Sequence, residues 1–147
     1  MSVKPVPDGY HTVTPYLVVE DVNAQIEFMK KAFGAAETEK IQGPDGAVMH
    51  AEVKIGDSSI MLGQARDQQE PMPTCLYLYV EDMEAVYKSS LAAGGESIIE
   101  PTDMFYGDRN AGVKDPQGNL WWIATHIEDV SSEELHRRAS AHQPGKK

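Results

Sequence analysis

The sequence predicts an α+β fold made of two strand–helix–strand–strand–strand (βαβββ) modules, whose mixed sheets curve around a cavity. The first observation is a repeat, because residues 16–24 return as residues 77–85 with six of the nine positions identical. The second is that each copy alternates in polarity and then ends in a helix-start signal, Asp21 or Asp82. A repeated unit of this kind determines the architecture, and two half-open sheets would enclose a space that neither makes alone.

The first module is expected over residues 12–64. Residues 12–19 alternate in polarity, as does a strand with one buried face. Asp21 then serves as the N-cap of a helix, whose apolar residues recur at helical spacing until Gly34 ends it. Turn-forming residues separate the remaining strands, which are residues 37–42, 48–55 and 58–63.

The second module is expected over residues 74–127, after a polar linker with two prolines. Asp82 caps its helix and Gly94-Gly95 ends it, as Gly34 does in the first module. A loop is predicted over residues 101–108. The strands of this module are predicted at residues 75–80, 97–100, 109–114 and 120–125.

The two ends of the chain are expected to lie outside the modules. Residues 1–9 have neither the apolar core nor the cleavage site of a signal peptide, and we predict an N-terminal tail over residues 1–11. Residues 128–147 are predicted to form a short helix and a tail, because Ser131 and Glu134 make a capping box.

The charge and the cysteine content bear on partners and location. The chain has 147 residues and a net charge of -10, which argues against nucleic acid as a partner. This acidity either keeps the protein soluble or attracts a cationic ligand. No apolar segment approaches the about 20 residues that span a bilayer, so no membrane partner is expected. The single cysteine, Cys75, cannot form an internal disulfide, and the predicted location is the cytoplasm.

The strand positions that face away from the helices predict a ligand-binding cavity. These positions are aromatic and polar rather than aliphatic: Tyr16, His50, Glu52, Cys75, Tyr77, Tyr79 and Trp122. Aromatic walls suit flat or cationic molecules, through stacking and cation–π contacts. Tyr106, beside Phe105 on the loop of the second module, is expected to close over the ligand. The alternative is that the rings only pack between the two modules.

Three further candidates each allow two interpretations. His50 and Glu52 point to one face, either as a catalytic acid–base pair or as a hydrogen-bonded pair that anchors the cavity wall. Arg109 either binds an anionic group of the ligand or clamps a neighbouring carboxylate. Cys75 is either a nucleophile or a small buried thiol, and the second is favoured because the sequence supplies no neighbouring base.

Several motifs occur in a fixed order along residues 12–138. They are Thr14-Pro15-Tyr16-Leu17, His50-Ala51-Glu52, Tyr106-Gly107-Asp108-Arg109, Asp115-Pro116-Gln117-Gly118-Asn119-Leu120-Trp121 and Ala124-Thr125-His126-Ile127-Glu128-Asp129-Val130-Ser131. With the doubled module, they make the chain resemble the vicinal oxygen chelate (VOC) superfamily, and within it the PhnB-like branch of glyoxalase/bleomycin resistance proteins. The resemblance implies the VOC fold; it says little about the reaction, because one fold serves many chemistries.

The resemblance also implies where a metal would bind. Metal-using members take one ligand from the first strand and one carboxylate from the last strand of each module. Those positions here are Thr14, Ile60 or its neighbour Met61, Cys75 and Trp122. A catalytic divalent ion needs about three protein ligands, and this set does not supply them. We therefore expect no metal cofactor there; the alternative is a divalent ion at a displaced site with His50, Glu52 and His126.

The leading functional hypothesis is a metal-independent binding protein for a small organic molecule such as a cationic drug. Such a protein would be similar to bleomycin resistance proteins, which sequester drugs and confer antibiotic resistance. Relatives of this kind work as homodimers, so the resemblance implies a homodimer. The alternative is an enzyme, namely a lyase, isomerase or dioxygenase, that uses a displaced metal or the Glu52–His50 pair as acid and base.

Overall fold

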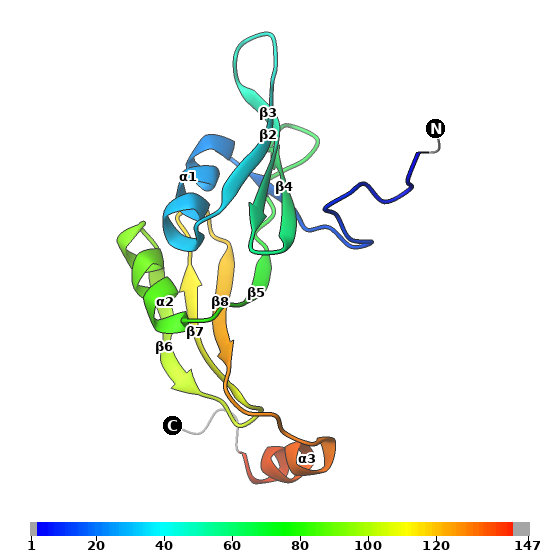
Figure 1. The fold of residues 1–147 in the computed structure, drawn as a ribbon. Helices are drawn as coiled ribbons and strands as arrows, with labels where there is room; N and C mark the ends of the chain where they lie inside the picture. The colour runs from blue at the N-terminus through cyan, green and yellow to red at the C-terminus, as the bar shows by residue number, and fades with distance from the viewer. Residues whose placement is uncertain (1–2, 143–147) are drawn as a thin grey trace.

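The structure is a computed structural model that describes residues 3–142, which form two mixed four-stranded sheets and three helices (Figure 1). The first module consists of β1 (Tyr16–Val19), α1 (Val22–Phe33), β2 (Ala36–Gln42), β3 (Val48–Ile55) and β4 (Ser58–Gln64). The second consists of β5 (Cys75–Tyr79), α2 (Met83–Ala92), β6 (Glu96–Asp103), β7 (Asp108–Lys114) and β8 (Leu120–His126). Helix α3 (Ser132–Ala141) follows. The predicted pair of βαβββ modules is confirmed.

The two sheets share one topology. The strand order is β1-β4-β3-β2 in the first sheet and β5-β8-β7-β6 in the second. The β1–β4 and β5–β8 pairs are parallel, and the others are antiparallel. The registers agree as well, because Tyr16 pairs with Met61 and Tyr77 pairs with Trp122. The repeat in the sequence therefore relates the modules residue by residue.

Side-chain caps begin the helix of each module, as the sequence predicts. Asp21 Oδ1 accepts from the Ala24 backbone N–H at 3.0 Å, and Asp82 Oδ1 accepts from that of Ala85 at 3.2 Å. Helix α1 ends at Gly34, whose φ of 69° lies in the left-handed region that glycine adopts without strain. These local signals are why the same turn into a helix forms twice.

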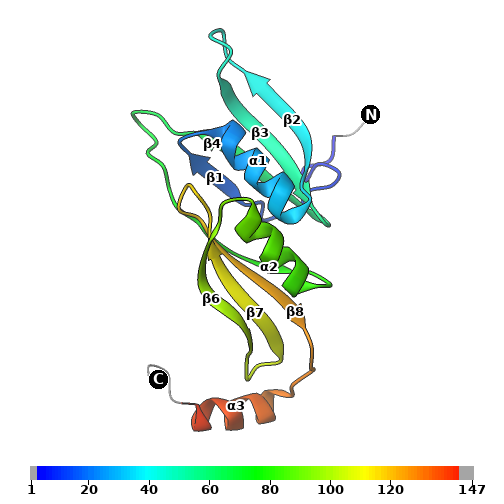
Figure 2. The same cartoon turned by 90° about the vertical axis from the view of Figure 1, so that its left-hand side faces the viewer.

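Helices α1 and α2 lie on the same side of the molecule, each against its own sheet and in contact with each other (Figures 1 and 2). The opposite face of each sheet, here called the open face, is covered by neither helix. The open faces follow one another along the long axis of the molecule (Figure 1). Within residues 3–142, the two sheets of one chain thus do not enclose the expected cavity by facing each other.

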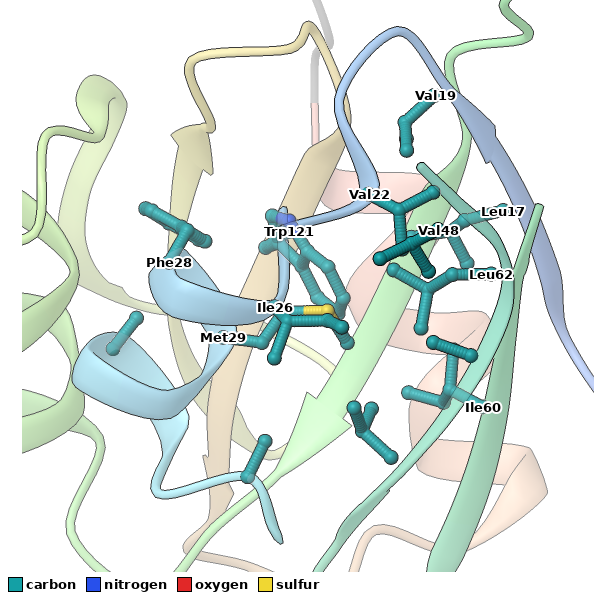
Figure 3. Packing of buried hydrophobic residues seen from close by; sticks show 14 residues of the cluster. Leu17, Val19, Val22, Ile26, Phe28, Met29, Val48, Ile60, Leu62 and Trp121 are labelled. Atoms are coloured by element: carbon teal, nitrogen blue, oxygen red, sulfur yellow. The ribbon is translucent and has the colours of Figure 1, made fainter. Parts of the chain in front are cut away.

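A residue of the second module completes the core of the first. Trp121 of β8 is fully buried in one cluster with Val22, Ile26 and Met29 of α1 (Figure 3). Its indole Nε1 donates to Asp115 Oδ2 at 2.8 Å. The polar N–H of the indole therefore keeps a hydrogen-bond partner although the ring is buried. This side chain joins the two modules into one folded body.

Two strand boundaries differ from the sequence prediction by more than one residue. Strand β1 begins at Tyr16 instead of residue 12. Strand β6 continues to Asp103 through Pro101, where a loop was expected. It can do so because β6 is an edge strand, where a proline needs no backbone partner. Residues 1–2 and 143–147 of the predicted tails lie outside the described residues.

The structure also bears on the membrane question. No helix within residues 3–142 is both long enough and apolar enough to cross a bilayer.

Candidate functional site

The open faces gather most of the residues predicted to line a cavity. In the first sheet, Tyr16 and Glu52 both pair with Met61, and His50 pairs with Gly63, so these side chains share one face. In the second sheet the open face carries Cys75, Tyr77, Tyr79 and Trp122. The two groups lie on different sheets of the same chain.

A buried carboxylate organises the open face of the second sheet. Asp108, at the start of β7, is only 3% exposed. Its Oδ2 accepts from the hydroxyls of Tyr77 at 2.6 Å and Tyr79 at 2.9 Å. Its Oδ1 lies 2.8 Å from His126 Nδ1. Three side chains from β5 and β8 thus converge on one carboxylate, and their bonds offset the cost of burying its charge.

These hydrogen bonds control protonation. Burial alone would raise the pKa of Asp108, but the bonds from Tyr77, His126 and Tyr79 outweigh it and lower that pKa. Burial, followed by the bond to Asp108, raises the pKa of Tyr77; the bond to Asp108 also raises that of Tyr79. Bonds to Asp108 and Asp129 raise the pKa of His126. At neutral pH the cluster therefore holds a carboxylate, two neutral phenols and an imidazole biased toward its charged form.

Asn110 connects this cluster to the loop after β6. Its Nδ2 donates to the hydroxyls of Tyr77 at 3.1 Å and Tyr106 at 2.9 Å. Because the Tyr77 hydroxyl already donates to Asp108, only the amide nitrogen of Asn110 suits that oxygen. The amide Oδ1 is buried and has no hydrogen-bond partner among residues 3–142. Tyr106, predicted to close over a ligand, is thus tied to the polar cluster.

The open face of the first sheet holds a smaller group. The Tyr16 ring lies across Gly63, and a Cβ atom at that glycine would collide with the Tyr16 hydroxyl. The ring centres of Tyr16 and His50 are 5.9 Å apart, and His50 Nε2 lies 2.9 Å from Glu52 Oε2. The side chains of His50 and Glu52 are 26% and 17% exposed, so the pair is hydrogen-bonded and still accessible to solvent.

Arg109 and Cys75 take part in the hydrogen bonds of neither group among the described residues. Arg109 follows Asp108 and points to the opposite side of the sheet, where its Nε donates to Glu84 Oε1 of α2 at 2.7 Å. Its Nη1 donates to Asp103 Oδ1 at 2.9 Å, so the guanidinium clamps two carboxylates. Cys75 is exposed, which corrects the expectation of a buried thiol. The reason is that it starts an edge strand on a face that no helix covers.

The positions at which the superfamily binds its metal do not fit a divalent ion. Met61 lies on the open face, whereas Ile60 is buried in the core. A thioether and the Trp122 indole are not ligands for a hard cation, and the Thr14 hydroxyl donates to the carbonyl of His11. In the part of the chain that the structure describes, no three His, Cys, Asp or Glu side chains are grouped to hold a metal.

Sequence reasoning missed the centre of the second-sheet cluster, since Asp108 and Asn110 are not among the predicted site residues. The signal is present, because both alternate with Arg109 and buried Ala111 and therefore share the face of Trp122. Two polar residues on a strand so rich in buried positions indicate a hydrogen-bonded cluster. Their partners on β5 and in the loop come from distant parts of the chain, which strand periodicity does not reveal.

Comparison with known proteins identifies relatives along most of the chain. A family model described as "Glyoxalase/Bleomycin resistance protein/Dioxygenase superfamily" matches residues 10–123. The chain is 30% identical over 144 residues to Uncharacterized protein Mb0911c of Mycobacterium bovis, with 90% of this chain and 95% of that protein covered. It is also 30% identical over 144 residues to Uncharacterized protein Rv0887c of Mycobacterium tuberculosis, with 90% and 85% covered.

Solved structures share the fold. TioX from Micromonospora sp. ML1 has a TM-score of 0.68 at 20% identity, over 80% of this chain and 99% of that chain. A glyoxalase/bleomycin resistance protein/dioxygenase family enzyme from Burkholderia phytofirmans PsJN has a TM-score of 0.62 at 21% identity, over 76% and 95%. At such identities the likeness concerns the fold alone. From the doubled module and the family match over residues 10–123, the chain belongs to the Glyoxalase/Bleomycin resistance protein/Dioxygenase superfamily.

Proposed function

We propose that the protein belongs to the PhnB-like branch and binds a small, flat organic cation without a metal cofactor, as drug-sequestering bleomycin resistance proteins do. One observation carries this proposal: the open faces present aromatic side chains to solvent. Tyr16, Tyr77 and Tyr79 are 44%, 40% and 65% exposed. Rings left uncovered in this way can stack on a planar ligand and make cation–π contacts, each worth about 0.5–2 kcal/mol.

The charge distribution supports a cation as the ligand. Asp108 is held in its anionic form beneath the phenols of Tyr77 and Tyr79. The chain as a whole carries a net charge of -10, which raises the local concentration of cations. Trp122, packed against Gly112 on the same face, adds an indole to the aromatic surface.

We propose that two copies form the site as a homodimer. A ligand held between two open faces needs one face from a second copy, because those of one chain follow one another along the molecule (Figure 1). Ile41 and Ile99, which pair with His50 and Gly112 of the open faces, are 50% and 42% exposed. Apolar side chains in such positions favour association. Sedimentation should give a dimer that Ile99→Lys dissociates; a monomeric wild-type chain would refute this part of the proposal.

Tryptophan fluorescence tests ligand binding. Trp121 is fully buried, whereas Trp122 lies on the open face, so the two indoles report on different surroundings. A cationic drug such as bleomycin should quench Trp122 at about micromolar concentration. The variant Trp122→Phe should lose the quenching and keep the emission of Trp121. An unresponsive wild-type protein across a panel of cationic aromatic drugs would leave the proposal without support.

A second candidate function rests on the His50–Glu52 pair. A carboxylate 2.9 Å from an imidazole nitrogen, on a face open to solvent, can move a proton on a bound substrate. The enzyme would be a lyase, isomerase or dioxygenase, acting by this pair or with a divalent ion at a displaced site. Turnover of a methylglyoxal–glutathione adduct that is lost in Glu52→Gln supports the acid–base form, and turnover lost on chelation supports the metal form.

The proposed location is the cytoplasm. The exposed thiol of Cys75 would be open to oxidation outside a reducing compartment, and the chain contains no second cysteine to pair with it.

A further inference from the structure

The two modules meet at two junctions that the internal repeat relates to each other. At one, the β7–β8 turn meets the start of α1; at the other, the β3–β4 turn faces the start of α2. The registers of the two sheets make Ile60 the counterpart of Trp121, since Val53 pairs with the first and Val113 with the second. The junctions are called filled and open below, because their side chains differ.

The filled junction is closed by polar contacts and an indole. Gln117 Oε1 accepts from the backbone N–H of Asp21 at 2.9 Å, and its Nε2 donates to the Asp21 carbonyl at 2.8 Å. Behind this contact, the buried Asp115 accepts from Gln25 Nε2 and from Trp121 Nε1, each at 2.8 Å. The indole of Trp121 occupies the space between the modules.

The open junction lacks all of these contacts. The counterparts of Gln25, Asp115 and Trp121 are the apolar residues Val86, Ile55 and Ile60, and Ile60 is much smaller than the indole of Trp121. The turn is also one residue shorter, because Gly56-Asp57 stands where the filled junction has residues 116–118. Among the described residues, no hydrogen bond joins Gly56-Asp57 to α2. A groove of about 810 Å³ remains between this turn and α2.

The groove has apolar walls and an acidic rim. The walls include Phe33, Ile55, Ile60, Leu76, Leu78 and Val86. Asp57, Glu81 and Asp82 line it too, and none of the described lining residues is basic. Asp82 caps α2 and offsets the partial positive charge at the start of that helix, which leaves Asp57 and Glu81 as rim charges. An apolar body with a positive group therefore matches the groove in both shape and charge.

One side of the groove is a strand edge that no other strand pairs with among residues 3–142. Strand β5 is an edge strand of the second sheet. Its backbone hydrogen bonds to β8 are made by residues that alternate with Tyr77 and Tyr79, such as Val80. The backbone groups of both tyrosines thus point into the groove, which both residues line. In the first module the matching edge is bridged, because Met72 N donates to the Val18 carbonyl at 3.0 Å. Free carbonyl oxygens on the β5 edge are acceptors for an ammonium group.

We infer that this groove binds an arylalkylamine, that is, an aromatic ring of indole size that carries a protonated amine. The ring takes the place that the Trp121 indole takes at the filled junction. The ammonium lies at the rim between Asp57 and Glu81. The groove is on the flank between the modules and not on an open face, so the inference stands or falls independently of the proposed function.

Calorimetry and NMR with the full chain and tryptamine test this inference. Binding should be about millimolar, as expected for a ligand of this size, and should shift the methyl signals of Ile55, Ile60 and Val86. Neutral tryptophol should bind at least about threefold more weakly, and anionic indole-3-acetate more weakly still. Failure of tryptamine to bind at about 10 mM, or shifts confined to Trp122 and the open faces, would overturn the inference.

The repeat supplies matched control variants. Glu81→Gln should weaken tryptamine about threefold, whereas Glu20→Gln at the filled junction should not change it. Ile60→Trp copies the filled junction and should abolish binding. Because a larger side chain there strains the core, Ala85→Trp tests the same point from the exposed surface of α2, with Ala24→Trp as its counterpart on α1. Equal affinity in Ala85→Trp and Ala24→Trp would refute the site.

Discussion

The hydroxyl of Tyr77 donates to the buried carboxylate of Asp108 across 2.6 Å, and the same oxygen accepts from Asn110 Nδ2 at 3.1 Å. One phenol on β5 is therefore hydrogen-bonded to both buried polar side chains of β7. This arrangement holds the ring of Tyr77 on the open face of the second sheet, because rotation of the ring would cost Asp108 one donor and Asn110 one acceptor.

Removal of the Tyr77 hydroxyl should lower the free energy of unfolding more than is usual for a partly exposed residue. Tyr77→Phe should lower the free energy of unfolding by about 1–2 kcal/mol, since Asp108 loses a donor and Asn110 an acceptor. Urea denaturation measures the change. Tyr87→Phe is the control, because that hydroxyl bonds only Ser97 at an exposed site. Equal losses in the two variants would contradict the role given to Tyr77.

His126 should give the stability a pH dependence of definite sign. Its bonds to Asp108 and Asp129 raise its pKa above the ordinary 6.5, so the folded state holds the proton more tightly than the unfolded state. This contribution is complete below pH 6.5 and is lost as the pH rises through the raised folded pKa. NMR titration should place the His126 pKa above 6.5 and show it lowered in Asp108→Asn. A normal pKa in the wild type would refute this prediction.

Asp115 should be the most sensitive residue of the filled junction. Asp115→Ala would leave the buried donors Gln25 Nε2, Trp121 Nε1 and the backbone N–H of Asn119 without partners. The expected loss is about 3 kcal/mol of unfolding free energy, together with a red shift of Trp121 emission as water enters. Asp57→Ala, at the exposed turn of the open junction, should change stability by less than about 0.5 kcal/mol.

Arg138 should be required to dock helix α3. Its guanidinium donates to Glu128, to Glu134 and to the carbonyl of Phe105. Arg138→Ala should speed amide exchange in α3 and leave β7 protected, as measured by hydrogen–deuterium exchange. Arg137→Ala is the control, because among the described residues Arg137 forms hydrogen bonds with Glu134 alone. Similar amide exchange of α3 in Arg138→Ala and Arg137→Ala would argue against a role for Arg138 in docking the helix.

The bonds from Arg137 and Arg138 to Glu134 should weaken in acid. Bonds from Arg137 and Arg138 lower the pKa of Glu134 to about 2. A lowered folded pKa means that the contribution is complete above the ordinary value of 4.5 and is lost as the pH falls toward 2. Amide exchange in α3, corrected for the intrinsic rate, should therefore rise between pH 4.5 and 2 before β7 opens. Unchanged protection of α3 down to pH 2 would contradict this assignment.

The sequence predicts the modules because their signals are local. The caps at Asp21 and Asp82 and the alternation along each strand specify both βαβββ units. The Asp108 cluster depends on tyrosines about thirty residues away and on a loop, and no periodicity encodes that convergence. The exposure of Cys75 likewise follows from how the sheets are covered, which local pattern does not specify.

Gln117 fastens the β7–β8 turn to the start of α1, and the opposite flank of the molecule has no equivalent fastening among residues 3–142. A relative rotation of the modules is then expected to change the width of the unfastened side more than that of the side held by Gln117. A molecule bound in the groove at the open junction would set the angle between the two sheets. The relative orientation of the open faces would change with that angle. Binding in the groove would therefore move the aromatic rings of Tyr16 and Tyr77 relative to each other.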